Sequence, residues 1–419
     1  GDGLSWHFDG SFLDKGLTKT PTFTDNGEEP VRGNKIRNSK VETYSFGGGF
    51  SIKSGNRLIG FSIDNYNSEY GVPKLINHKL DLNKTTFNLL FDDSVDLGII
   101  QRVKAKVKYT DYEHDEFDLN FLETKYKRDS TNARLEFFTE TQGGISGILG
   151  FELINSRNPV IASAHEEEEH EDEPGADISL EQQTIHARLT HNGPVGPFNG
   201  FRADLSSTTF EQTETVEEEE NGVDVLVNTN FDQDTLHLRS EFTGSFADWQ
   251  TLAGVEFRES ELTAAVIHAE EEEEEEEEDH AHGFYLPNTD RSNLGLFIFA
   301  ERERNNWLTE LAIRFDSLEQ DSFHEDPTEN ASVSHDLTNI SAGLARKLDG
   351  NLLVGGSVSS TERAPSLVEL FAEGKHHAVG RTEIGDTTLD KETSLSAELY
   401  VRNGWNDSRL SVSIFNNDY

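Results

Sequence analysis

Two acidic segments of this sequence carry histidines beside runs of glutamate. Imidazole and carboxylate groups together are a ligand set for zinc, and less selectively for nickel or copper, whereas carboxylates alone suit calcium or magnesium. The histidines therefore favour capture of a transition metal, and the alternative is a solvated surface loop in which they have no role. The histidines concerned are His165, His170, His268, His280 and His282.

A second pair of candidate ligands lies in a segment of strict alternation. Apolar side chains alternate with polar ones over residues 103–109, and the same period then places His114 and Glu116 on the polar face with Tyr112 and Asp118. If this segment is a strand of a membrane barrel, the polar face lines the lumen. His114 and Glu116 would then be metal ligands in the lumen, and the alternative is a polar wall that hydrogen-bonds to a second domain.

Enzyme motifs are missing from the sequence. There is no cysteine, so no thiol nucleophile and no thiolate metal site, and we find no His-Glu-x-x-His, Gly-x-Ser-x-Gly or phosphate-binding loop. We therefore expect a protein that is not an enzyme.

The composition excludes two further classes. The 419 residues have a formal net charge of −43, which argues against a nucleic-acid binder because such proteins need a basic face. No apolar run approaches the ~18 residues that a membrane-spanning helix needs. Three acidic runs, at 166–173, 217–220 and 270–279, repel themselves and are predicted to be solvated loops.

Two-residue alternation recurs along the whole chain and predicts strands. One clear example is a hairpin in which 44–53 and 59–63 are strands joined by a turn at Ser54–Asn56. The alternation over 103–118 exceeds the ~9–11 residues that cross a bilayer, which favours a transmembrane barrel over a soluble sandwich or propeller. Short turns are predicted at Arg128–Asn132 and Leu348–Asn351, opposite long acidic extracellular loops.

One segment has helical rather than strand spacing. Leu367, Leu370 and Phe371 share a helical face, Pro365 suits the first turn of a helix and Gly374 suits its end. We predict a short helix inserted among strands.

Four segments resemble TonB-dependent outer-membrane receptors. Glu362–Gly374 with its continuation to Ser394 is similar to a motif of that family, and Tyr70–Pro73 is similar to the segment that ends an early barrel strand. Asp111–Glu116 resembles a strand of the subgroup associated with zinc acquisition, and Phe415–Tyr419 resembles another barrel strand. The resemblance therefore covers nearly the whole chain.

The resemblance implies an all-β fold, a transmembrane antiparallel barrel of about twenty-two strands with a plug domain in its lumen. Residues 1–419 would then form one barrel domain, incomplete at both ends and without the plug. The resemblance also implies a metal-binding role for at least one of His376 and His377, which follow the predicted helix, and the alternative is that they are ordinary loop histidines. The implied partners are outer-membrane lipid and the TonB–ExbB–ExbD complex, reached through the plug, and we expect a monomer.

These observations predict a receptor in the outer membrane of a Gram-negative bacterium that captures zinc on its extracellular loops and passes it to the lumen. Zinc is here the transported ligand and not a catalytic cofactor. The alternative within the class is a receptor for a metal chelate, such as a siderophore or haem. The alternative outside the class is a passive porin or a structural barrel, and a plug with a TonB-binding segment encoded upstream would exclude it.

Overall fold

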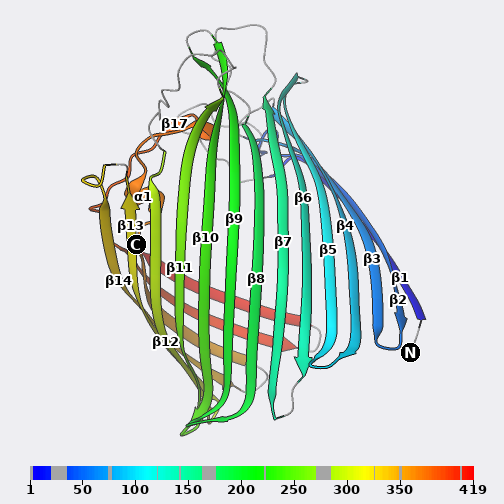
Figure 1. The fold of residues 1–419 in the computed structure, drawn as a ribbon. Helices are drawn as coiled ribbons and strands as arrows, with labels where there is room; N and C mark the ends of the chain where they lie inside the picture. The colour runs from blue at the N-terminus through cyan, green and yellow to red at the C-terminus, as the bar shows by residue number, and fades with distance from the viewer. Residues whose placement is uncertain are drawn as a thin grey trace.

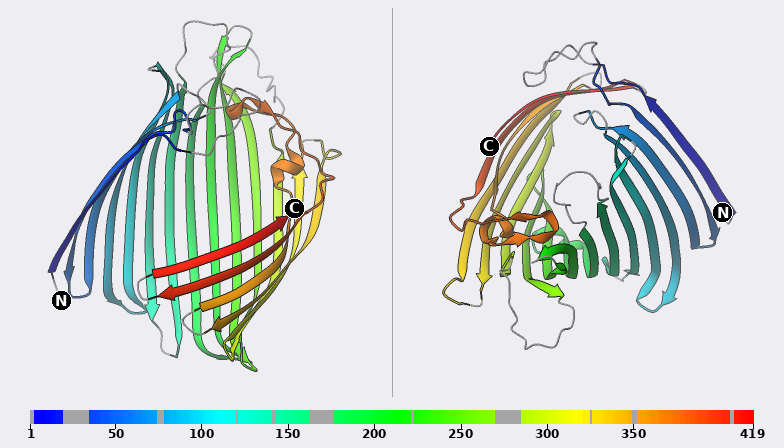
Figure 2. Two further views of the ribbon diagram at one scale, coloured as in Figure 1. Left: turned by 180° about the vertical axis from the view of Figure 1, so that it is seen from behind. Right: turned by 90° about the horizontal axis from the view of Figure 1, so that it is seen from above.

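The alternating segments fold as strands of one large antiparallel sheet, which curls around a central space (Figures 1 and 2). The computed structural model describes residues 3–19, 35–73, 78–119, 121–140, 143–162, 176–220, 223–269, 285–324, 326–348, 352–405 and 408–419. Within these residues 17 strands belong to the sheet, and two short strands form a separate pair. The predicted all-β class is confirmed, and the strand number of the complete barrel stays a prediction.

The strands of the large sheet follow the chain in order. They are β1 (Gly3–Lys15), β2 (Val41–Ser54), β3 (Arg57–Gly71), β4 (His78–Leu97), β5 (Ile100–Asp118), β6 (Phe121–Glu140), β7 (Ile145–Ala162), β8 (Ala176–Val195), β9 (Phe198–Glu220), β10 (Val223–Phe246), β11 (Trp249–Ala269), β12 (Asn288–Arg304), β13 (Trp307–Phe323), β14 (Ala331–Leu348), β15 (Leu352–Arg363), β18 (Glu392–Trp405) and β19 (Ser408–Asp418).

Each strand pairs with the next one along the chain from β1 to β15, and β15 then pairs with β18 and β18 with β19. Because every pair is antiparallel, the chain reverses direction at each connection. The ends of β5, β7, β9 and β11 therefore lie at one rim of the sheet, together with the starts of β4 and β6. Residues that are far apart in the sequence can meet at this rim.

The register gives the sheet one apolar and one charged face. On one face Ala105 pairs with Leu135, Leu135 with Phe151 and Phe151 with Ile185. On the other face Lys106 pairs with Arg134 and Arg134 with Glu152. Phe151 is 40% exposed although it is apolar, and large apolar side chains of the same face remain exposed from strand to strand. This arrangement is that of a barrel with lipid on the apolar side and a polar lumen.

The predicted hairpin is confirmed, because β2 ends at Ser54 and β3 begins at Arg57. Gly55 at the turn has a φ of 60°, a left-handed conformation that glycine adopts without strain. The predicted short connection after Leu348 also agrees with the end of β14 and the start of β15 at Leu352.

The turn predicted at Arg128–Asn132 is wrong, because these residues lie inside β6. Their side chains find partners across the sheet: Asp129 accepts a hydrogen bond from Tyr109 at 2.8 Å, and Asn132 donates one to Glu152 at 2.8 Å. Cross-strand partners thus outweigh the local turn preference of these polar residues.

The run Glu217–Glu220 is not a loop either, because β9 extends to Glu220. The side chain of Glu218 is only 13% exposed and forms an ion pair with Lys375. The prediction failed because a basic residue 157 positions away supplies the charge that this carboxylate needs.

A short helix interrupts the strands, as predicted. α1 (Leu367–Phe371) begins after the N-cap Ser366, so that Pro365 precedes the cap instead of opening the helix. It is followed by β16 (Lys375–His376), a 3₁₀ turn at His377–Val379 and β17 (Arg381–Thr382). Figure 1 places α1 and β17 at the same end of the sheet as the upper ends of β9 and β10. No helix in the described ranges is long and apolar enough to cross a membrane.

Candidate metal centre

The helix α1 is fixed at its N-terminus by a capping box. The Glu369 amide donates to Ser366 Oγ at 3.2 Å, and the Ser366 amide donates to a Glu369 carboxylate oxygen at 2.6 Å. The Arg363 guanidinium donates to both oxygens of Glu369 at 3.1 Å. This hydrogen bond lowers the pKa of Glu369 to about 2, so the carboxylate stays ionised for capping.

The other side of α1 is held by apolar packing. Leu370 and Phe371 are almost fully buried against residues from the end of β11 and from the segment before β12. Gly385 passes close behind the helix, where a Cβ would lie 2.5 Å from the Leu370 carbonyl carbon. These contacts fix the segment that follows α1 beside the upper part of β9. The buried members of the cluster are Ala264, Tyr285, Leu286, Leu370, Phe371 and Ala372.

His376 is the residue that this scaffold positions most completely. Its Nε2 lies 2.9 Å from Oε2 of Glu214, a buried carboxylate on β9. The ring of Tyr285 stacks on its imidazole with 4.3 Å between centroids and 24° between planes, and the Tyr285 hydroxyl donates to Glu383 at 2.8 Å. The hydrogen bond to Glu214 raises the pKa of His376, and burial acts in the opposite direction. Burial raises the pKa of Tyr285, and the hydrogen bond to Glu383 adds to this.

His377 makes a second imidazole–carboxylate pair, with a glutamate four residues after Glu214 on β9. Its Nδ1 lies 2.8 Å from Oε1 of Glu218, while Lys375 Nζ donates to the other oxygen of Glu218 at 2.7 Å. A metal ion at this carboxylate would have to compete with the ammonium group. The structure therefore favours His376 and Glu214 over His377 and Glu218 as ligands.

His376 and Glu214 offer one nitrogen and one oxygen to a zinc ion. Zinc binds histidine nitrogen and carboxylate oxygen at about 2.0–2.2 Å, which in a tetrahedral site places the two ligand atoms about 3.3–3.5 Å apart. The observed 2.9 Å is a hydrogen-bond separation, so the two atoms would move apart by about half an ångström to hold an ion between them. An ion held by these two residues alone would keep coordination positions open for water or for further ligands.

The second predicted pair, His114 and Glu116, lies elsewhere on the polar face. His114 Nε2 is 3.9 Å from a Glu116 oxygen, and the Tyr112 hydroxyl lies 3.3 Å from His114 Nδ1. His114 Nε2 is shielded from solvent and has no hydrogen-bond partner within the described part of the chain. The described residues show no contact that joins this pair to His376 or His377.

The loop histidines are placed only in part. His165, His170, His280 and His282 lie outside the described residues, and the side chain of His268 does too, although its backbone pairs with Val227 on β10. The acidic runs 166–173 and 270–279 also lie outside the described ranges. The strands that precede them, β7 and β11, end at the same rim.

Sequence reasoning missed the carboxylates that meet His376 and His377. Glu214 belongs to an alternating stretch of β9 whose inward side also carries Val216, which is 1% exposed. The alternation could have indicated that Glu214 faces inward, but it does not identify His376 as its partner. A further group at the rim, made of His78, Asp118 and Glu123, was not predicted as a site.

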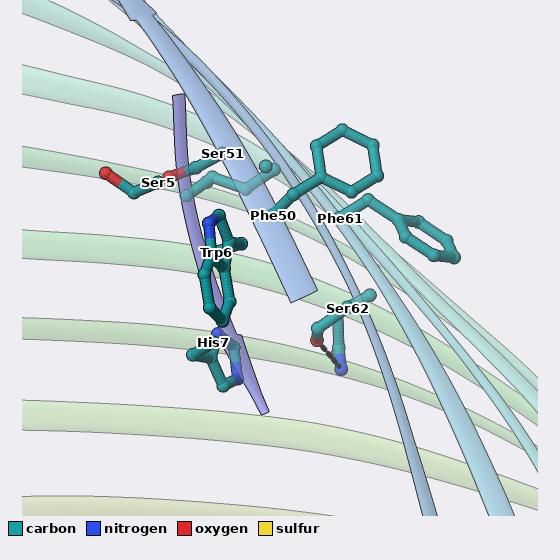
Figure 3. Close-up of a pocket in the computed structure, with 10 residues that line it drawn as sticks. Ser5, Trp6, His7, Phe50, Ser51, Phe61 and Ser62 are labelled. Atoms are coloured by element: carbon teal, nitrogen blue, oxygen red, sulfur yellow. Dashed lines mark hydrogen bonds between the residues drawn. The ribbon is translucent and has the colours of Figure 1, made fainter. Parts of the chain in front are cut away.

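A cavity of about 400 Å³ lies apart from these groups, at the edge formed by β1 to β4. Figure 3 shows Phe50 and Phe61 side by side on one side of the strands, and Ser62 with its hydrogen bond on the other. The cavity is a groove across the sheet edge and offers no cluster of ligand atoms.

Comparison with known proteins identifies the fold. A family model described as "TonB dependent receptor-like, beta-barrel" matches residues 21–419. No curated protein matches the sequence.

Solved structures with the same fold include two metal transporters and one outer-membrane receptor. The FrpB iron transporter from Neisseria meningitidis (F3-3 variant) is 10% identical with a TM-score of 0.51, over 99% of this chain and 72% of that chain. The copper transporter OprC is 10% identical with a TM-score of 0.50, over 97% and 69%. The alcaligin receptor FauA from Bordetella pertussis is 12% identical with a TM-score of 0.53, over 90% and 67%. At these identities the likeness shows the fold alone.

Proposed function

Because this chain belongs to the TonB-dependent receptor family of β-barrels, we propose that it is the barrel of a receptor whose cargo is a divalent transition metal, zinc in the first place. Members of this family are transporters in the outer membrane of Gram-negative bacteria and are not enzymes, and they depend on TonB for transport. The proposal extends this shared function to one kind of cargo.

The observation that carries the proposal is the pair of His376 and Glu214. One imidazole and one carboxylate lie within hydrogen-bond distance of each other, on a capped helix–loop unit and a strand that are each held in place by other contacts. Rigid elements that present one nitrogen and one oxygen ligand favour zinc over calcium or magnesium, which prefer oxygen alone. Ligands from a plug would complete the coordination.

The partners proposed for this receptor follow from the same reasoning. We expect energy to reach it through a complex of TonB with ExbB and ExbD acting on a plug, and we expect a monomer in the outer-membrane lipid. The loop histidines at 165, 170, 268, 280 and 282 would collect zinc above the barrel, and His114 with Glu116 would bind it in the lumen.

The test is calorimetric titration of zinc into the receptor in detergent, with His376→Ala and Glu214→Gln as variants. His237→Ala is the matched control, because His237 also lies 3.2 Å from a carboxylate, Glu256, but two arginines already bind that carboxylate. Loss of even an outer partner of a metal ligand costs about 10- to 100-fold in affinity, so each site variant should lose at least that much and the control should lose nothing.

The alternative cargo is a metal chelate such as a siderophore or haem; FauA, which has the same fold, is described as an outer-membrane receptor for alcaligin. Zinc affinity that is unchanged in both site variants, together with binding of a ferric siderophore or haem, would replace zinc with a chelate as the cargo.

A further inference from the structure

Three side chains that can bind a metal converge at the rim of the barrel, on strands other than the one that carries Glu214. His78 is the first residue of β4 and pairs with Asp118, the last residue of β5, and Glu123 lies near the start of β6. His78 Nδ1 is 3.0 Å from a Glu123 oxygen and its Nε2 is 4.0 Å from an Asp118 oxygen. One ligand atom from each residue fits within 4.8 Å of the others.

An irregularity in the sheet brings Glu123 into this group. Glu116 pairs with Thr124 and Phe117 pairs with Leu122, so Glu123 has no partner on β5. An extra residue of this kind forms a bulge, which redirects a side chain relative to its neighbours in the strand. Here the bulge turns the Glu123 carboxylate toward His78.

The backbone of His78 is held in place from the neighbouring segments. Asn38 Nδ2 donates to the His78 carbonyl oxygen at 2.6 Å and to the Val72 carbonyl oxygen at 3.1 Å, and the Val72 amide donates to the His78 carbonyl oxygen at 3.2 Å. The imidazole is therefore presented from a fixed position. Such support keeps a metal site close to its bound geometry before the ion arrives.

The charge balance of the group calls for a cation. Neither Asp118 nor Glu123 forms an ion pair with a lysine or arginine of the described ranges, because Lys79 pairs with Glu69 and Lys125 pairs with acids on the opposite face. Asp118 Oδ1 is shielded from solvent and accepts no hydrogen bond within the described residues. A shielded carboxylate oxygen without a partner is costly, and a bound cation would satisfy it.

We propose that His78, Asp118 and Glu123 bind a divalent transition metal and form a second metal site of this barrel, at the rim. One imidazole nitrogen and two carboxylate oxygens suit zinc, and also the harder manganese and iron(II), at about 2.0–2.2 Å from the ion for zinc. The ligands are partly exposed, with side-chain exposures of 27%, 38% and 33%, so that an ion can enter from the medium and leave again.

The rim site continues into the lumen along one strand. Asp118, Glu116 and His114 share a face of β5, and successive residues on one face of a strand are about 6.5–7 Å apart. An ion released by Asp118 would therefore meet Glu116 and then the unpartnered Nε2 of His114. This onward step rests on the proposed transport function, whereas binding at the rim does not.

The test is residue-specific protection from diethyl pyrocarbonate, which modifies neutral imidazoles, read by mass spectrometry on the receptor in detergent with and without zinc chloride. At a zinc concentration of about ten times the dissociation constant, bound zinc should slow modification of His78 about tenfold. In the double variant Asp118→Asn with Glu123→Gln, His78 should react equally fast with and without zinc. His237 is the internal control and should react at one rate in every sample.

Each outcome separates this site from His376. Protection at His376 that persists in the double variant shows that the variant is folded and that only the rim site is lost. If zinc does not slow modification of His78 in the receptor without substitutions, or still slows it in the double variant, the rim site does not exist. If zinc protects His78 but not His376 in the receptor without substitutions, the result contradicts the proposed cargo site and supports the rim site.

Discussion

Nε2 of His376 lies 2.9 Å from Oε2 of Glu214, although 162 positions separate the two residues in the chain. The loop residue is held by the stacked ring of Tyr285, which itself packs in one cluster with the buried end of α1. The strand residue is held by the pairing of β9 with β8 and β10. Neither side chain has to be ordered when a ligand arrives, which lowers the free-energy cost of binding.

Zinc affinity at His376 and Glu214 should decrease at low pH, and the hydrogen bond between the two residues should set the pH at which the decrease begins. Glu214 raises the pKa of His376, so the imidazole keeps its proton to a higher pH than an ordinary histidine near ~6.5, and zinc must displace that proton. Affinity should be constant above the raised pKa and fall about tenfold per pH unit below it. In Glu214→Gln the fall should begin at a lower pH. Dissociation constants measured from about pH 5.5 to about 8.5 test this, and an unchanged onset in the variant contradicts it.

Removal of the helix cap should weaken the metal site without unfolding the barrel. Ser366→Ala removes a hydrogen bond that stabilises the start of α1, a loss of about 0.5–2 kcal/mol for a typical cap. Amide exchange at Leu370 should become faster and zinc affinity should fall, while thermal unfolding of the sheet stays the same. Thr388→Ala, which loses a hydrogen bond to Asp386 in the same connection but no cap, is the control. Equal effects of both variants would mean that α1 does not position His376.

Cysteine labelling should distinguish the two faces of β5. Ala105 shares a face with Leu135 and Phe151, and Lys106 shares the other with Arg134 and Glu152. In a lipid bilayer, a label on Ala105→Cys should be quenched by lipid-soluble quenchers, and one on Lys106→Cys by water-soluble quenchers. The reverse pattern would show that His114 points to lipid and cannot bind metal in the lumen.

The loop histidines should form a weaker class of zinc sites than the lumen residues, because long acidic segments must lose conformational freedom when they bind an ion. Changing all five to alanine should remove this weak class from the titration and leave the tighter one, whereas His114→Ala should affect only a tighter site. If neither variant alters zinc binding or growth under zinc limitation, these histidines have no role in capture. The five are His165, His170, His268, His280 and His282.

The strands and faces of this fold could be predicted from the sequence because alternation is a local property. The hairpin at Gly55 and the helix before His376 were predicted for the same reason. The turn expected at Arg128–Asn132 was wrong because the side chains that satisfy these residues, such as Tyr109 and Glu152, come from neighbouring strands.

Only part of each proposed metal site could be predicted from the sequence. A histidine after a helix is visible in a sequence, but the carboxylate that it meets depends on how far the sheet curls and on the register of each pair. The rim group could not be predicted for the same reason, because Glu123 approaches His78 only through a β-bulge, and no local sequence pattern indicates that bulge. Long-range partners in a barrel are set by the sum of many local registers.

The length of β9 determines how far the proposed site at Glu214 lies from the lower rim of the barrel. Glu214 is sixteen residues after Phe198, where β9 begins beside a two-residue turn. At about 3.3 Å per residue and a tilt of about 40°, this places the carboxylate about 40 Å above the lower rim. The hydrocarbon layer of a bilayer is only about 30 Å thick. If the lower rim lies at the inner edge of that layer, an ion bound at His376 and Glu214, as we propose, would lie on the outer side of the membrane. Its occupancy would then follow the free metal concentration of the medium, and the ion would cross the bilayer only after binding.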